Sequence, residues 1–151
     1  MKLAEALILR SDMQKRLAVL KDRIFKNAQI QEGDQPSEDI ELLIREYENV
    51  TVKLGTVIKA INTTNINSII SEDETIAERI VDRDMIKAKF NMYSSLVSEA
   101  TVTKDRWGRS EIKFISNVNV SELRKKADSM AQKYREIDTA IHSKNWNVDL
   151  I

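Results

Sequence analysis

The sequence predicts an all-α protein, a bundle of four long helices with a short β-hairpin before the last helix. Two series of seven apolar residues alternate spacings of three and four, one from Ile40 to Ile61 and the other from Val120 to Ile141. This is the pattern of a coiled-coil-like helix face, which is buried only when another helix covers it. Three glycines and one proline in 151 residues are too few for a fold with many turns. We therefore expect one helical domain over residues 1–151.

Composition narrows the class of protein. Lysine plus arginine equals aspartate plus glutamate at 24 residues each, so no overall field attracts nucleic acid or an anionic membrane. The absence of cysteine excludes disulfides and thiolate chemistry and fits a cytoplasmic location. Glu5 interrupts what would be the apolar part of a secretion signal, and the longest charge-free segment, residues 60–71, is too short to span a bilayer. We expect a cytoplasmic protein with no membrane span.

The first two helices are expected to lie side by side. Helix one runs from near the N-terminus to about Gln29, with Arg10 interrupting its apolar stripe. Residues 31–37 contain the only proline and are expected to form a connection. Ser37 is the expected N-cap of a second helix, which should end near Ile61. Basic residues crowd the end of the first helix (Lys15, Arg16, Lys21, Arg23, Lys26) and acidic residues the start of the second (Glu38, Asp39, Glu41, Glu46, Glu48). An antiparallel hairpin would make these two groups neighbours.

In the middle of the chain, the pattern of residues predicts a loop, a third helix and then a β-hairpin. Residues 62–68 are rich in Asn, Thr and Ser, which predicts that the second helix ends there and a loop follows. A third helix is expected to start near Glu74 or Thr75 and to present an apolar stripe that Arg83 interrupts. Residues 101–104 and 111–115 are largely β-branched or alternating, so we expect a β-hairpin there.

The last helix has a clear start signal. Asn119 is the expected N-cap, with Glu122 three residues on, and the helix should run to about Lys144. The terminal segment 145–151 is expected to dock, with Trp146 packing against a helix or a neighbouring subunit. Because four long apolar stripes exceed what one slim bundle can cover, the sequence predicts a homo-oligomer.

Five segments match a known family in order and spacing. They are Met1–Leu7, Ile61–Asn65, Arg109–Lys113, Tyr134–Thr139 and Asn145-Trp146. Together they resemble the septicolysin-like family of small uncharacterised bacterial proteins over nearly the whole chain. The resemblance implies a helical fold and oligomerisation, and it implies no established catalytic residues.

Candidate metal chemistry is incomplete in this sequence. His142, the lone histidine, has only Asp138 at helical spacing, and a structural or surface role for it is favoured. Two acidic pairs suggest half of the magnesium-binding motif of helical nucleotide pyrophosphohydrolases: Glu38 with Glu41, and Glu78 with Asp82. A solvated acidic face is the favoured interpretation, because a magnesium site needs carboxylates that converge. We therefore expect no catalytic residues, no metal site and no cofactor.

Two arginines within apolar stripes are the better binding candidates. Arg10 and Arg83 must each find a carboxylate or another acceptor. Ion pairs that set register inside an oligomer are the favoured interpretation, and a small anion or ligand pocket is the alternative. The candidate binding residues are Arg10, Asn62, Asn65, Arg83, Arg109 and Glu111.

The basic residues around Trp107 could stack on and bind nucleic acid, but Asp105 and Glu111 lie among them and a packing role for the ring is favoured. The sequence therefore favours a non-enzymatic oligomeric scaffold or interaction protein, with a possible protein partner that it does not identify. The alternatives are a metal-dependent hydrolase of nucleotide-like substrates and a membrane-active, cytolysin-like protein.

Overall fold

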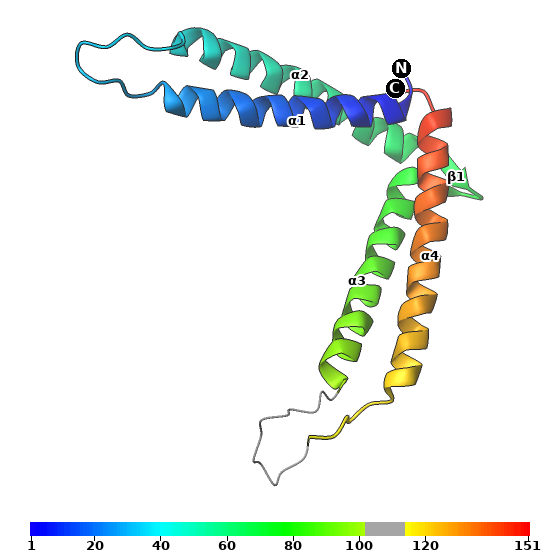
Figure 1. Ribbon diagram of the computed structural model, residues 1–151. Coiled ribbons are helices and arrows are strands. Elements are labelled where there is room, and N and C mark those ends of the chain that lie inside the picture. The colour runs from blue at the N-terminus through cyan, green and yellow to red at the C-terminus, as the bar shows by residue number, and fades with distance from the viewer. Residues whose placement is uncertain (102–113) are drawn as a thin grey trace. The chain divides into compact units, whose positions relative to one another are not determined.

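A computed structural model describes residues 1–101 and 114–151 of the chain (Figure 1). Its elements are α1 (Leu3–Lys26), α2 (Ile40–Asn67), β1 (Ile69–Ser71), β2 (Glu74–Thr75), α3 (Ile76–Ala100) and α4 (Val120–Asn147). Within the described residues the chain is mainly helical, with four helices and one two-stranded sheet, so the helical class is confirmed. The packing of all four helices into one bundle stays a prediction.

The described chain divides into two compact units. The first unit comprises Met1–Ile69 and His142–Ile151, and the second comprises Ile70–Ile141. Most of α4 therefore belongs to the second unit, and its C-terminal end belongs to the first. The expectation of a single domain stays a prediction.

The core of the first unit lies between α1 and α2, which run antiparallel (Figure 1). The side chains buried in this unit include Leu20 of α1 and three members of the predicted stripe of α2, namely Leu43, Leu54 and Ile61. Covering such a stripe removes apolar surface from water, which stabilises the folded state by roughly 25 cal/mol for each Å² buried. The predicted helical hairpin is confirmed.

Both ends of α2 differ from the prediction. Asp39, not Ser37, is the N-cap, and its carboxylate accepts hydrogen bonds from the backbone N–H groups of Glu41 and Leu42. The helix does not end near Ile61 but continues through the Asn- and Thr-rich segment to Asn67. The polar side chains there bond back to the helix instead of ending it: Thr64 donates to the carbonyl of Ala60 at 2.8 Å, and Asn67 donates to the carbonyl of Thr63 at 2.8 Å.

The C-terminal segment docks against the first unit, as predicted. Leu3 N–H donates to the carbonyl of Val148, and Leu150 N–H donates to the carbonyl of Met1, both at 2.9 Å. These bonds form an antiparallel bridge between Lys2 and Asp149, whose side chains also make an ion pair of 2.9 Å. Trp146 is not buried within the chain, since 55% of this residue is exposed, and its packing against a neighbouring subunit stays a prediction. The segment is held by backbone bonds that do not need the indole ring.

The second unit opens with the small sheet. Strands β1 and β2 pair through the turn at Glu72, whose φ of 45° lies in the left-handed region that tight hairpin turns use. Part of the segment expected to be a loop is therefore a strand. Thr75 caps α3, accepting from the N–H of Glu78 while the Glu78 carboxylate accepts from the N–H and hydroxyl of Thr75. This confirms the predicted start of the third helix.

Helix α4 begins as predicted and ends later. The Asn119 side chain accepts a hydrogen bond of 3.2 Å from the N–H of Glu122, and the helix continues to Asn147. Helices α3 and α4 run antiparallel, since residues early in α3 contact residues late in α4. The predicted β-hairpin falls almost wholly on residues 102–113, which lie outside the described residues.

Candidate functional site

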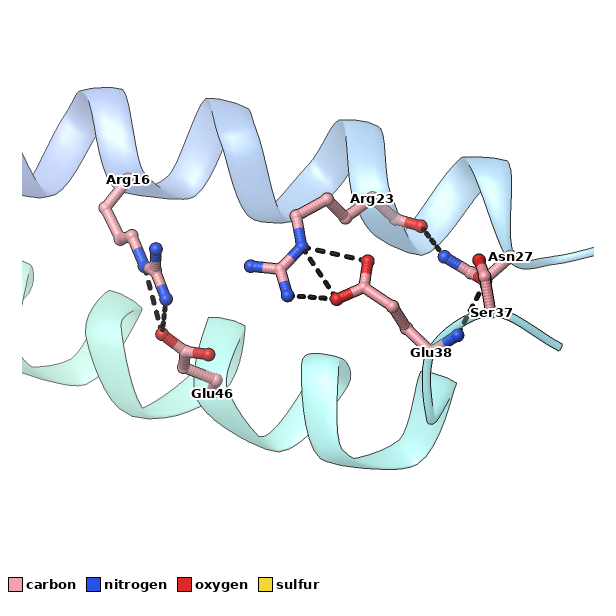
Figure 2. A network of polar contacts seen from close by, with 6 residues as sticks. All are labelled: Arg16, Arg23, Asn27, Ser37, Glu38 and Glu46. Carbon is pink, nitrogen blue, oxygen red and sulfur yellow. Dashed lines mark hydrogen bonds and ion pairs between the residues drawn. The ribbon is translucent and has the colours of Figure 1, made fainter.

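Two ion pairs connect α1 to α2 and to the residues just before it (Figure 2). Arg16 Nε donates to Glu46 Oε1 at 3.0 Å, and Arg23 Nε donates to both carboxylate oxygens of Glu38 at 3.0–3.1 Å. The hydrogen bond from Arg23 lowers the pKa of the Glu38 carboxyl below its ordinary value. Asn27 links the connection to this network by accepting from the Ser37 hydroxyl and from the Glu38 N–H. The pairs fix the register of the hairpin.

Arg83 joins α3 to α4. Its Nη1 donates to Asp138 Oδ1 at 3.2 Å, and its Nε and Nη2 donate to Asp84 Oδ1 at 3.0 and 2.9 Å. Burial opposes the charged form, but the bonds to Asp84 and Asp138 outweigh it and raise the pKa of Arg83 above its ordinary value. The guanidinium in the apolar stripe has thus found carboxylates, as the sequence required.

Aromatic rings and lysines continue this contact along α3 and α4. Lys87 Nζ lies 5.7 Å from the ring centre of Tyr134, and Lys126 Nζ lies 5.9 Å from that of Tyr93. Both distances are within reach of a cation–π attraction. The face of α3 that carries Arg83, Lys87, Phe90 and Tyr93, which we call the inner face, is therefore the face turned to α4.

A shallow groove of about 250 Å³ lies on this helix pair. It is lined by Lys87, Phe90, Asn91, Ala131, Tyr134 and Arg135. Two cations and no carboxylate line it, so a small anion is the ligand that its charge would favour. Its volume falls below the roughly 300–1,000 Å³ of ordinary ligand pockets, and the groove is therefore a weak candidate for a substrate site.

The opposite side of α3 carries a second apolar face. Val81, Met85, Ala88 and Met92 follow one another at spacings of four, three and four, and Val81, Met85 and Met92 are 58%, 55% and 50% exposed. At about 100° per residue these four side chains lie roughly opposite the inner face. We call them the outer face of α3. A helix that is apolar on two opposite sides, with one side exposed, is a candidate interaction surface.

The predicted binding residues are distributed over both units. Arg10, Asn62 and Asn65 belong to the first unit and Arg83 to the second. The Nε of Arg10 is buried and has no hydrogen-bond partner among the described residues, whereas Asn62 is exposed. Two further candidates, Arg109 and Glu111, lie outside the described residues. The anion pocket that would unite these residues stays a prediction.

Three of the four acidic residues considered for magnesium have structural roles. Glu38 is paired with Arg23, Glu78 completes the cap of α3, and Asp82 lies 3.7 Å from Arg79. Among residues 1–101 and 114–151, no three His, Cys, Asp or Glu side chains are grouped so as to hold a metal ion. The same part of the chain contains no helix whose length and apolarity would let it cross a bilayer.

Comparison with known proteins places the chain in a family. Residues 10–150 match the model of DUF6847, a family of unknown function. The chain belongs to the DUF6847 family. It is also similar to a functionally unknown conserved protein from Corynebacterium diphtheriae, whose crystal structure matches with 38% sequence identity and a TM-score of 0.95 over 100% of this chain and 99% of that one. No curated protein matches it.

The candidate surface of this DUF6847 protein contains residues that the sequence analysis did not single out. The outer face of α3 has a helical spacing that is visible in the sequence, but only one stripe was assigned to this helix. Periodicity shows that two faces are apolar and does not show which one is covered. The spacing of Lys87 and Arg135 in the sequence does not indicate that they line one groove, because the groove joins residues from two helices far apart in the sequence.

Proposed function

We propose that this protein is a non-enzymatic helical scaffold or interaction module that associates with itself through apolar side chains exposed on its helices. The observation that carries the proposal is the outer face of α3, where Val81, Met85 and Met92 are each at least half exposed. A contiguous apolar face that the chain does not cover is a typical feature of an interaction site.

Other exposed apolar residues support the same proposal. Large apolar side chains are exposed on the other helices as well, among them Ile8, Val19, Phe25, Leu42, Ile44, Ile66 and Trp146. Single exposed apolar residues need no explanation, but their number here fits a protein that buries more surface on association.

The charged residues argue for a structural protein rather than an enzyme. Arg16 and Arg83 each face a carboxylate on a neighbouring helix, and Arg23 faces that of Glu38, just before α2. Because these charged groups are paired within the chain, they serve to orient its helices and offer little to a substrate. We extend the proposal to a cytoplasmic setting and to kinship with septicolysin-like proteins, on which the comparisons do not bear.

Light scattering of the purified protein in dilute solution tests the proposal. We expect a mass that is a multiple of the 17.4 kDa chain and that rises with protein concentration. A mass of 17.4 kDa at every concentration up to the millimolar range would contradict self-association. In that case the exposed faces would have to serve a different partner.

A further inference from the structure

The geometry points to the outer face of α3 as a two-fold interface with a second copy of this chain, in which the two α3 helices pack antiparallel. This inference rests on the proposed self-association and specifies the surface, direction and register. The residues concerned are Val81, Met85, Ala88 and Met92, all on the exposed side of one helix. The spacing of four, three and four is that of one coiled-coil seam.

The register follows from the spacing. When Met85 of one copy lies opposite Ala88 of the other, Val81 lies opposite Met92, because both pairs are centred between Ile86 and Lys87. Two-fold symmetry repeats each pair, so four residues give four matched contacts. Each contact joins a long, flexible methionine to a smaller side chain, which allows the helices to approach closely without a void.

Charges beside the seam agree with this register. Asp82 and Lys89 are seven residues apart and therefore lie on the same flank of the outer face. In an antiparallel pair that flank faces the same flank of the second copy, so Asp82 of each chain approaches Lys89 of the other. Lys89 is exposed and forms none of the ion pairs found among the described residues, so it is available for this contact.

Self-complementarity favours a second copy over a different partner. In a parallel arrangement this flank would face the opposite flank of the second copy, so the contact between Asp82 and Lys89 would not form. A second copy, related by a two-fold rotation, provides both the matching apolar seam and the matching charges. An unrelated partner would have to provide both independently. The seam is only about three turns long, and interfaces below about 1,200 Å² are typical of weak association, so we expect a dimer that depends on concentration.

Cysteine cross-linking tests the register, because the chain has no cysteine of its own. Val81→Cys and Met92→Cys proteins are prepared separately, mixed and oxidised. We expect the mixed disulfide between positions 81 and 92 to exceed both homodimeric disulfides at least tenfold. In the proposed register two copies of position 81 are separated by about 16 Å along the helix, beyond the reach of a disulfide. A mixture of Val81→Cys with Val52→Cys, an exposed position on α2, is the matched control and should not cross-link.

The other possible outcomes contradict the antiparallel direction, the interface or the proposed self-association. Predominant homodimeric disulfides would show a parallel pair and overturn the inference. If the wild-type protein is oligomeric but no mixed disulfide forms, the chains associate through another surface, so the proposed function survives and this interface does not. If the wild-type protein is a monomer at all concentrations, both fail.

Discussion

Thr64 is a fully buried polar residue whose hydroxyl links α2 to the end of the chain. Its hydroxyl donates to the carbonyl of Ala60 at 2.8 Å and accepts from the N–H of Ile151 at 3.0 Å. Both bonds are internal, so the hydroxyl needs no water. A threonine in a helix can turn its hydroxyl back to the preceding turn, and here the second bond holds the terminal residue.

Replacing Thr64 by valine should release Ile151. Valine has the same shape but no acceptor, so Thr64→Val leaves the Ile151 N–H without its protein partner and should lower the free energy of unfolding by about 1–2 kcal/mol. Thr64→Ser keeps the hydroxyl and is the matched control. Hydrogen exchange of the Ile151 amide should accelerate in the valine variant and change much less in the serine variant. Equal exchange in the wild-type and valine proteins would contradict this role.

Among the helices, the ion pair of Arg23 on α1 with Glu38, just before α2, should make the hairpin sensitive to acid. Arg23 keeps the pKa of Glu38 below its ordinary value of 4.5. A carboxyl of this kind binds fewer protons in the folded state than in the unfolded state. Its contribution to stability is therefore complete above about pH 4.5 and is lost as the pH falls through the lowered pKa.

Glu38→Gln removes this titration. We expect the variant to be less stable than the wild type at pH 7 and the difference to shrink as the pH falls below 4.5, because protonation removes the charge that glutamine already lacks. Urea unfolding between pH 2.5 and 7, followed by circular dichroism, measures this. Glu41→Gln, an exposed change in the first turn of α2, is the control. A stability difference that does not depend on pH would disprove the account of the pair.

Capping signals in the sequence predicted the starts of α3 and α4 correctly. The caps at Thr75 and Asn119 depend on side chains within three residues, and both were predictable. The end of α2 was not, because polar side chains such as those of Thr64 and Asn67 can either end a helix or bond back to it, and Thr64 is also held by Ile151, 87 residues away. Arg83 could be recognised as a residue that needs an acceptor, but Asp138, 55 residues on, could be identified only from the packed helices.

At the scale of the whole molecule, α3 is the element that connects fold with proposed function. Its inner face is covered by α4 through contacts such as that of Arg83 with Asp138, and its outer face is exposed. A helix needs only one apolar side to pack within its own chain. A second apolar side with self-complementary charges is most simply explained by association between copies.

Sedimentation equilibrium of the wild-type, Met85→Lys and Val52→Lys proteins tests this central claim most directly. Met85 and Val52 are 55% and 71% exposed, so neither change should disturb the fold, but only Met85 lies on the outer face of α3. We expect wild type and Val52→Lys to associate with increasing concentration and Met85→Lys to remain at 17.4 kDa, because a lysine in the centre of the seam places two like charges close together. Association of Met85→Lys with undiminished affinity would contradict the claim.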